Sequence, residues 1–230
     1  MEQLGNITLH HGDCLEVLRT LHDKSFDLAI VDPPYFSGPE RRGFYGKRCS
    51  TIGVERVDYH KSDKWRVPDS EYFRELERVS RYYIVWGCNY FDYQFAPGRI
   101  VWDKCNQSSS FSDCEIAATN LFSSVRLFAF MWNGMCQGKS IKEGRVMQGN
   151  KKLNEKRIHP TQKPVALYAW LLMQYAQEGW RILDTHLGSG SIAIACENLC
   201  FPLVGIELDL HYYDAARKRI IDYQNEPRLF

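Results

Sequence analysis

Apolar and polar residues follow one another along the chain in a pattern that predicts strands and helices in turn. Residues Phe26–Val31 form a largely apolar run that ends at two prolines, which is typical of a buried parallel strand stopping at a functional loop. In 14–24 the leucines are spaced for one face of a helix. A Ser/Glu capping pattern at the start of 70–80 predicts a second helix there.

The rest of the chain continues this alternation. Its expected elements are strands at 6–13, 82–87, 99–104 and 202–209, a hairpin-type pair at 115–122 and 125–132, helices at 164–176 and 211–224, and a strand, glycine turn and helix within 181–199. Strands that alternate with helices predict an α/β fold with a doubly wound, mostly parallel, Rossmann-like sheet. We expect the 230 residues to form a single domain.

Basic charge gathers in two irregular segments of the sequence. Residues 36–66 carry a net charge of +4 and residues 139–157 a net of +5, whereas the whole chain carries only +1, so the remainder is acidic. The irregular stretches 37–66 and 103–157 exceed ordinary connection lengths, and loops this long are usually functional. This distribution is expected of a surface that contacts phosphates, although two solvated loops would look the same.

Composition argues against several other protein classes. No apolar run is long enough for a membrane span, and the first residues lack the pattern of a secretory signal. The eight cysteines form no CxxC pair, and no His/Cys cluster has metal-ligand spacing. We therefore expect a reduced, cytoplasmic protein with no bound metal.

A glycine-rich turn lies between the strand and the helix expected within 181–199. The segment from Asp184 to Ala193 contains a GxGxxA pattern, and Glu207 ends the next expected strand, 19 residues after Gly188. Such glycines let the backbone approach a ligand closely, and an acid in this place accepts hydrogen bonds from ribose hydroxyls. The pattern predicts a nucleoside-type cofactor, without separating NAD from S-adenosylmethionine; a plain tight turn with a surface Glu is the other interpretation.

The loop after the first buried strand reads Asp32-Pro33-Pro34-Tyr35. An exocyclic base amine is a poor nucleophile because its lone pair is delocalised into the ring. The Asp32 carboxylate and the Pro33 carbonyl can each accept one N–H and so free that lone pair. The prolines stiffen the loop, and Tyr35 offers a face for a flipped base. A proline-terminated strand with an exposed aromatic residue is the structural alternative.

Taken together, these motifs resemble the amino-methylating DNA methyltransferases, in the group whose DPPY loop precedes the cofactor glycine loop. The resemblance covers most of the chain. Its elements occur in the family's order: HGDCLEVL (11–18), DPPY (32–35), VWDK (101–104), HPTQKP (159–164), DTHLGSGS (184–191) and GIELD (205–209).

The resemblance implies a site-specific DNA methyltransferase that uses S-adenosylmethionine and methylates a flipped adenine at N6. The implied catalytic residues are Asp32, Pro33, Pro34 and Tyr35. The implied cofactor contacts are Asp13, Cys14, His159, Thr161, Lys163, Asp184, Leu187, Gly188, Ser189, Gly190, Ser191 and Glu207. Asp13 would bind the cofactor adenine amine, Glu207 the ribose, and the HPTQKP residues the methionine end. A homodimer is a further expectation from this group, as is a location in the cytoplasm of a bacterial cell or a phage-infected host.

Two features of the motifs bear on specificity. The family's cytosine-N4 enzymes more often carry Ser in the first position of the catalytic loop, so Asp32 favours adenine. Thr185-His186 stand where the family usually has Pro-Phe, which could alter cofactor affinity. We do not expect His186 to act as a general base, because the proton leaves only after methyl transfer has acidified the nitrogen.

Double-stranded DNA is the expected partner, and the basic segments are the expected contact surface. The candidate DNA-binding residues are Arg41, Arg42, Lys47, Arg48, Lys139, Lys142, Arg145, Lys151 and Lys152. In the family a target-recognition insert corresponds to 105–157. Its residues suited to reading base edges are Asn106, Gln107, Gln137, Gln148 and Asn150, each of which is equally suited to a turn.

Four other functions remain open at this point. Cytosine-N4 methylation and an RNA substrate would keep the same catalytic loop. A nicotinamide-dependent oxidoreductase would share the glycine turn but leaves DPPY and HPTQKP unexplained. A catalytically silent nucleic-acid-binding subunit would predict a degraded DPPY loop or cofactor acid, and both are intact.

Overall fold

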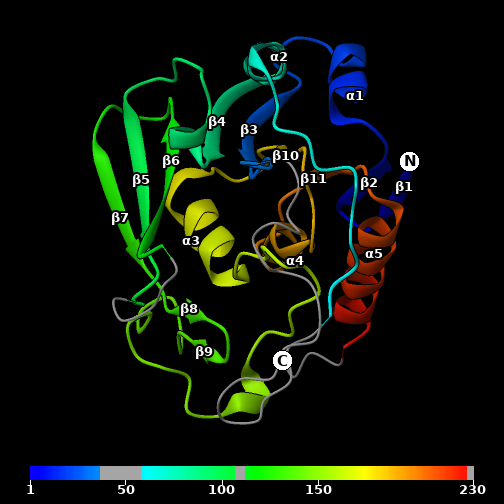
Figure 1. Cartoon of the computed structure of the whole chain (residues 1–230). Coiled ribbons are helices and arrows are strands. Elements are labelled where there is room, and N and C mark those ends of the chain that lie inside the picture. Colours follow the sequence, from blue (N-terminus) through cyan, green and yellow to red (C-terminus); the bar gives the residue numbers. More distant parts are fainter. Residues whose placement is uncertain (37–57, 107–111, 227–230) are drawn as a thin grey trace.

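The computed structural model describes residues 1–36, 58–106 and 112–226, and within them a nine-stranded sheet forms the centre of the molecule (Figure 1). Its spatial order is β1-β2-β11-β10-β3-β4-β6-β5-β7. The strands are β1 (Glu2–Leu4), β2 (Ile7–His11), β3 (Phe26–Val31), β4 (Ser80–Trp86), β5 (Gly98–Asp103), β6 (Cys114–Thr119), β7 (Val125–Ala129), β10 (Ile182–Asp184) and β11 (Leu203–Glu207). Five of the eight pairings are parallel, as the doubly wound prediction requires.

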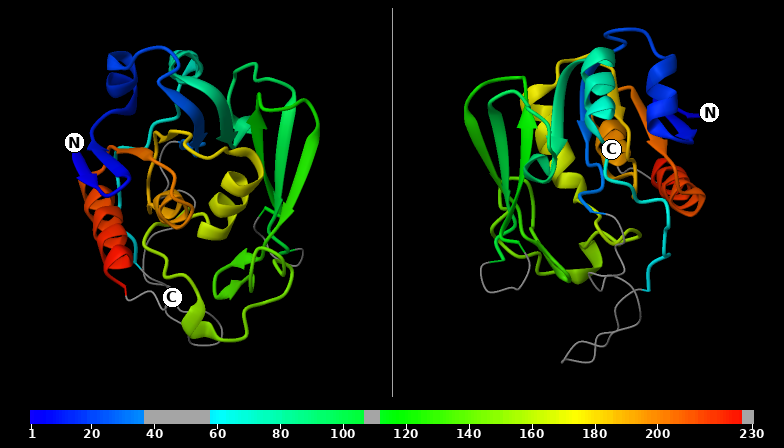
Figure 2. Two further views of the ribbon diagram at one scale, coloured as in Figure 1. Left: turned by 180° about the vertical axis from the view of Figure 1, so that it is seen from behind. Right: turned by 45° about the horizontal axis from the view of Figure 1, so that its top comes forward.

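Helices cover both faces of this sheet. They are α1 (Cys14–Thr20), α2 (Ser70–Val79), α3 (Val165–Tyr175), α4 (Ser191–Asn198) and α5 (Leu210–Asn225). One core joins α3, α4 and α5 to the sheet, and a second core joins α1 and α2 to the opposite face. In β3, Ile30 belongs to the first core and Val31 to the second, because successive side chains of a strand point to opposite faces. Two further views show the same layers (Figure 2).

The helix starts follow from capping. Asp13 is the N-cap of α1, and its Oδ1 accepts hydrogen bonds from the backbone N–H groups of Leu15 and Glu16. The cap of α2 is Asp69 rather than the Ser70 of the predicted capping pattern; Asp69 Oδ1 accepts from the N–H groups of Glu71 and Tyr72. The first helix ends at Thr20 instead of continuing to residue 24.

The predicted hairpin between 115–122 and 125–132 is wrong. β6 pairs with β4 on one side and with β5 on the other, and β7 pairs in parallel with the outer edge of β5. Thr119 and Asn120 tie the end of β6 to β4, since the Thr119 hydroxyl donates to the Tyr83 carbonyl and Asn120 Oδ1 accepts from the Tyr83 N–H. Both edges of β6 are therefore occupied, and β7 can only join beyond β5.

Beyond β7 the chain forms a small two-stranded sheet, β8 (Trp132–Asn133) with β9 (Cys136–Gln137), followed by the 3₁₀ turn η3 (Lys151–Leu153). The segment 105–157 thus contributes β6 and β7 to the central sheet before it leaves that sheet. In the described ranges, no helix has the length and apolar character needed to cross a bilayer.

The sheet changes winding direction between β3 and β10. From β3 the chain crosses through α2 to β4 on one side, and from β10 it crosses through α4 to β11 on the other. Crevices outside the carboxyl ends of strands at such a switch point are the usual ligand sites of doubly wound sheets. Asp32 follows β3 and Asp184 ends β10, so both motifs meet at this point.

Candidate active site

A cleft of about 1660 Å³ opens at the carboxyl ends of β3 and β10. Pockets for single small ligands usually measure about 300–1,000 Å³, so this cleft has room for a cofactor and a second reactant. All four residues of the DPPY loop line it. Its wall also contains the predicted cofactor contacts Asp13, Cys14, His159, Thr161, Lys163, Gly188 and Glu207.

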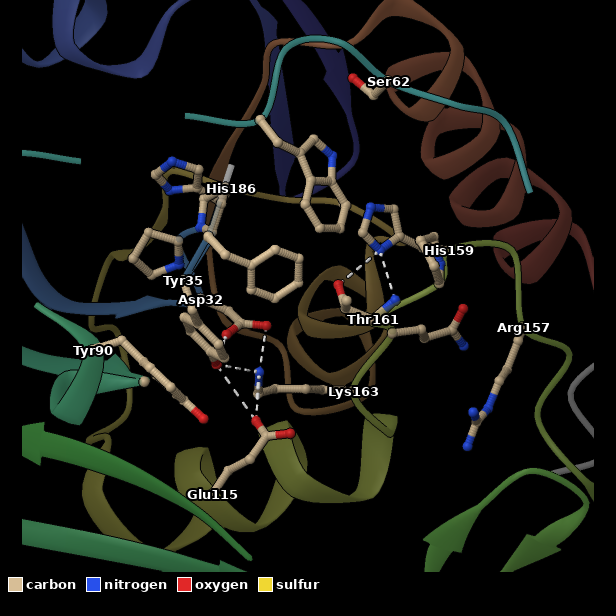
Figure 3. Close-up of a pocket in the computed structure, with 18 of the residues that line it drawn as sticks. Asp32, Tyr35, Ser62, Tyr90, Glu115, Arg157, His159, Thr161, Lys163 and His186 are labelled. Carbon is tan, nitrogen blue, oxygen red and sulfur yellow. Dashed lines mark hydrogen bonds and ion pairs between the residues drawn. The ribbon is translucent and has the colours of Figure 1, made fainter. Parts of the chain in front are cut away.

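A cluster of charged side chains surrounds the DPPY carboxylate. Figure 3 shows Lys163 between Asp32 and Glu115. The Lys163 ammonium contacts Asp32 Oδ2 and lies 2.9 Å from Glu115 Oε2, and it donates to the Tyr35 hydroxyl at 3.0 Å. The other oxygen of Glu115 lies 2.5 Å from the Lys104 ammonium. Two carboxylates and two ammonium groups therefore balance each other in the wall of the cleft.

Burial and ion pairing act in opposite directions on these groups. Burial raises the pKa of Asp32, an effect that the Lys163 charge only partly offsets. Burial would also raise the pKa of Glu115, but Lys163 and Lys104 together outweigh it and lower that pKa to about 2. The difference arises because Glu115 has a second ammonium partner. Although burial opposes its charge, the two carboxylates raise the pKa of Lys163, so this lysine stays protonated.

The ring of Tyr35 is fixed by three contacts. Its hydroxyl donates to Asp32 Oδ1, and its ring stacks on Tyr90 with centroids 5.0 Å apart and planes 11° from parallel. It also lies against Gly87, whose backbone adopts φ +70°; a Cβ there would sit 2.0 Å from a Tyr35 ring carbon. A base that stacks on the Tyr90-facing side of Tyr35 therefore requires this pair to separate.

The cofactor turn is shaped by a carboxylate and two glycines. Glu207 Oε2 accepts a hydrogen bond of 2.8 Å from the Gly188 N–H, which explains the 19-residue spacing read from the sequence. Gly188 and Gly190 both have positive φ, at +53° and +70°, a region that glycine reaches without strain. Gly12 donates to the Glu207 carbonyl and so brings Asp13 beside this turn. Carboxylates beside a glycine turn suit the hydroxyls and amine of a nucleoside.

Other predicted cofactor residues lie behind the wall. Ser189 and Ser191 bond to each other through their hydroxyls, and Arg219 donates both to the Ser189 carbonyl and to the Ser191 hydroxyl. Leu187 is buried and packs against Gly205. Neither these residues nor Gly190 lines the cleft, so they shape the turn from beneath.

Asp184 is also enclosed, with 2% of its surface exposed. Its Oδ1 accepts from the His186 N–H at 3.0 Å. Burial raises the pKa of Asp184 to about 8, with the neighbouring Asp32 and Glu207 adding to the effect. Negative charge at this position is therefore unfavourable until a cation comes near.

The HPTQKP segment is held by aromatic contacts. The His159 ring stacks on Trp65 with centroids 5.6 Å apart and meets Tyr212 edge-on at 4.3 Å. The Thr161 hydroxyl lies 3.2 Å from His159 Nδ1. Burial lowers the pKa of His159 to about 3, so its ring is neutral.

The Thr185-His186 pair occupies the floor between α1 and α2. The Tyr72 hydroxyl lies 2.5 Å from the Thr185 hydroxyl, which in turn lies 2.9 Å from His186 Nδ1. His186 Nε2 lies 3.8 Å from Cys14 Sγ. Burial lowers the pKa of His186 to about 4 and raises that of the Cys14 thiol to about 12. Both of these side chains are therefore neutral. Thr185 and His186 thus form a hydrogen-bonded chain with Tyr72 in the place where the family usually has the apolar pair Pro-Phe.

The predicted DNA-binding residues divide into two groups. Arg41, Arg42, Lys47 and Arg48, together with Gln107, lie outside the described residues. The other five, Lys139, Lys142, Arg145, Lys151 and Lys152, are exposed. Lys139 pairs with Glu143 at 3.0 Å, and Arg145 pairs with Asp103 at 2.9 Å.

All four of the described base-reading candidates have local partners. The Gln137 side chain bonds the N–H and the carbonyl of Glu155, and Asn150 caps η3. Gln148 accepts from the Asn150 N–H. Asn106 donates to the Ser112 carbonyl and lines the cleft with Gln137. These contacts give each of them a structural role.

Glu115, Tyr90 and Arg157 also line the cleft but were not among the predicted site residues. Glu115 lies on β6 and Tyr90 in the 3₁₀ turn η2 (Cys88–Tyr90). Arg157 lies apart from the Asp32 cluster in Figure 3, with its guanidinium 4.4 Å from the Trp132 ring centroid. None belongs to a recognisable motif, and a charged residue at the start of an expected strand was the only signal for Glu115.

The geometry of this cleft agrees with a family match. The N6_N4_Mtase family model, described as DNA methylase, matches residues 101–218, which is more than half of the chain. The chain belongs to this DNA methylase family. The resemblance inferred from the six motifs is thereby confirmed.

Two curated relatives of this methylase align with nearly the whole of its chain. It is 26% identical over 255 residues to the type II methyltransferase M.HinfI of Haemophilus influenzae, covering 96% of this chain and 70% of the relative. It is 24% identical over 251 residues to M2.DpnII of Streptococcus pneumoniae, covering 96% and 92% of the two chains.

Solved structures share the fold of the methylase. The M1.HpyAVI complex with S-adenosylmethionine superposes with a TM-score of 0.52 at 19% identity, covering 93% of this chain and 99% of the other. The cytosine-N4-specific PvuII DNA methyltransferase superposes with a TM-score of 0.54 at 13% identity, covering 96% and 93%. The predicted α/β class with its mostly parallel sheet is confirmed.

Replacing Gly87 with Ala tests the placement of Tyr35 in the methylase. The new Cβ overlaps the Tyr35 ring and φ is unfavourable for Ala, so we expect Tyr35 to leave Asp32 and Tyr90. Methyl transfer should fall at least about tenfold, with about 1–3 kcal/mol lost from the free energy of unfolding. Cofactor affinity, measured by calorimetry, should change little. Gly179→Ala, which also has a positive φ (+80°) but whose Cβ would meet open space, is the matched control; equal activity in both variants would contradict the assignment.

Replacing Asp184 with Asn tests the cost of burying this carboxylate. An Asp in the unfolded chain ionises near pH 4, whereas burial raises the folded pKa to about 8. Between these values only the unfolded chain loses the proton, so stability declines as pH rises. We expect Asp184→Asn to exceed the wild type in stability by at least about 1 kcal/mol at pH 8, with the gap closing near pH 4. Thermal denaturation across this range measures it, and a gap independent of pH would refute the explanation.

Proposed function

We propose that this DNA methyltransferase methylates the exocyclic N6 of adenine in double-stranded DNA. The observation that carries the proposal is the position of the Asp32 carboxylate at the sheet's switch point, in the same cleft as the glycine turn and Glu207. A target base in this cleft and a cofactor on the glycine turn would face each other. S-adenosylmethionine supplies the electrophilic methyl group on its sulfonium.

The catalytic role of the DPPY loop is to prepare the amine. Asp32 and the Pro33 carbonyl each accept one N–H of the base, which draws the nitrogen toward tetrahedral geometry and exposes its lone pair. Pro34 limits the loop's freedom, so these acceptors are held before the base arrives. Tyr35 supports the carboxylate through its hydroxyl and offers its ring to the base.

The residues that line the cleft are assigned to different parts of the cofactor. Asp13 is proposed to bind the adenine amine and Glu207 the ribose hydroxyls, since both carboxylates flank the glycine turn. His159, Thr161 and Lys163 are proposed to line the methionine end. Cys14 follows Asp13 and is proposed to lie in the floor of the site beside His186. Asp184 and the residues Leu187–Ser191 hold the turn in shape, and the Asp184 carboxylate becomes favourable when the cationic cofactor is close.

Adenine is favoured over cytosine by the first residue of the loop. Asp32 is an ionisable acceptor in a buried place, whereas the cytosine-N4 enzymes of this family more often have Ser. The fold does not distinguish the two reactions, because the PvuII enzyme named as cytosine-N4-specific shares it. The proposal of adenine therefore rests on Asp32.

The DNA surface is proposed to include the exposed basic residues of the insert 105–157. Lys142, Lys151 and Lys152 are exposed, and Lys151 reaches the rim of the cleft. Basic side chains at the rim position the duplex through its phosphates, without reading the sequence. Base recognition is assigned to the same insert.

Replacing Asp32 with Asn tests the catalytic assignment. Asn keeps the shape but loses the charge that accepts the amine, so we expect turnover to fall at least about a hundredfold. Binding of S-adenosylmethionine, measured by calorimetry, should persist. Turnover is measured as tritium transfer from the labelled methyl group into unmethylated genomic DNA; undiminished turnover would reject the mechanism.

Nucleoside chromatography of the labelled DNA identifies the base. We expect the label in N6-methyladenine. Label in N4-methylcytosine would keep the cleft and the mechanism but overturn the base assignment. Label in RNA alone would overturn the choice of nucleic acid.

Replacing both Lys151 and Lys152 with Gln tests the phosphate surface. The logarithm of DNA affinity falls with the logarithm of salt by about 0.9 for each phosphate contact. We expect the double variant to bind all DNA sequences more weakly and to reduce that slope by about 2. Lys218→Gln is the control, since this lysine is exposed on α5 and does not line the cleft. Fluorescence anisotropy across a salt series measures the slope; an unchanged slope would remove these lysines from the DNA surface.

A further inference from the structure

We propose that Glu115 is a positioning residue that holds Lys163 while Asp32 accepts the amine of the target base. This inference rests on the proposed function, because it concerns how the catalytic carboxylate becomes available. In this proposal Lys163 gives up its contact with Asp32 and keeps its contact with Glu115 when the base binds. It also gives Glu115, on β6, a role in the methyl-transfer step.

The starting point is the hydrogen bonding of Lys163. An ammonium has three N–H donors, and here three acceptors surround it: Asp32 Oδ2, Glu115 Oε2 at 2.9 Å, and the Tyr35 hydroxyl at 3.0 Å. The lysine side chain is only 4% exposed, so water cannot readily replace a lost partner. Asp32 itself is occupied on both oxygens, by Lys163 and by Tyr35.

An incoming amine must therefore displace part of this arrangement. When the amine donates to Asp32, Lys163 loses an anionic partner. Glu115 lets the ammonium keep one carboxylate partner. The exchange therefore replaces one hydrogen bond with another and does not leave a buried charge unpaired. Without Glu115, Lys163 would have only the Tyr35 hydroxyl, and a buried charge that loses its partner is strongly unfavourable. The lysine would then remain on Asp32 and exclude the amine.

Glu115 is well placed for this task because it is itself fixed. It stands on β6, which pairs with β4 and β5 along both edges. Its second oxygen is held by Lys104 at 2.5 Å. A carboxylate anchored on a central strand keeps its position while Lys163 shifts, and its low pKa keeps it ionised.

A purely structural ion pair is the competing explanation. In that case the loss of Glu115 would lower stability or cofactor binding and slow the reaction only indirectly. The two explanations differ in how Glu115 and Lys163 depend on each other. If Glu115 acts by holding Lys163, its loss should no longer change the rate of methyl transfer once the lysine charge has been removed.

The experiment is a double-mutant cycle on the full-length protein, with Glu115→Gln, Lys163→Met and both together. The rate measured is single-turnover methyl transfer into DNA from a preformed complex with S-adenosylmethionine. We expect Glu115→Gln to slow transfer about a hundredfold, with the Kd for the cofactor within about threefold of wild type. In the Lys163→Met background the same change should alter the rate by less than about threefold.

Glu115→Asp is the conservative control. It keeps the charge, so it should stay at least about tenfold faster than Glu115→Gln. If Glu115→Gln does not fold, Lys163→Met and the double variant carry the test, since the double variant removes the Lys163 ammonium and leaves only the partly exposed Lys104 without its carboxylate. If Lys163→Met is inactive, the ratio of the Asp to the Gln variant decides.

The outcomes separate this inference from the proposed function. Wild-type protein that transfers no label to DNA would refute the function itself. Active wild type with an equally active Glu115→Gln, or with equal losses in both lysine backgrounds, would refute only the role of Glu115. We expect Glu115→Gln to slow transfer only when the wild-type Lys163 is present. We also expect Glu115→Asp to restore much of the rate that Glu115→Gln loses.

Discussion

The pairing of β3 with β10 is the constraint on which the rest of the molecule depends. The chain leaves these neighbouring strands in opposite directions, so their carboxyl ends cannot be covered by the crossing helices. Asp32 and Asp184, which lie far apart in the sequence, therefore meet at one edge of the sheet. The HPTQKP segment reaches the same edge from the end of the insert and brings Lys163 between Asp32 and Glu115.

Placing several carboxylates at this edge conflicts with stability. Burial raises the pKa of Asp184, Asp32 and Glu207, which means that their ionised forms cost the folded state free energy. A cationic cofactor and an amine that becomes positive during the reaction both offset that cost. The cleft is thus better matched to the charges of the reaction than to those of the folded chain alone, a common compromise at active sites.

Much of this arrangement could be predicted from the sequence, because the signals are local. The buried strand Phe26–Val31, the DPPY loop and the glycine turn each combine an element with its end in one short segment. The hairpin prediction failed because β6 and β7 are close in sequence, while strand order depends on edges occupied by β4 and β5. Glu115 could not be found for the same reason: its contact with Lys163 exists only after β6 has taken its place in the sheet.

The neutral histidines of the cleft bear on what the reaction requires. His186 has a pKa lowered to about 4, and its Nδ1 lies within hydrogen-bond distance of Thr185, so it is a poor proton acceptor. His159 is buried with a pKa of about 3 and is packed between Trp65 and Tyr212. A mechanism that began with proton removal would be poorly served by either residue. Acceptors that hold the amine while its lone pair attacks need only be correctly placed, and an Asp32 released by Lys163 meets this condition. In the proposed exchange, catalysis depends on which carboxylate holds Lys163 more than on the strength of any base.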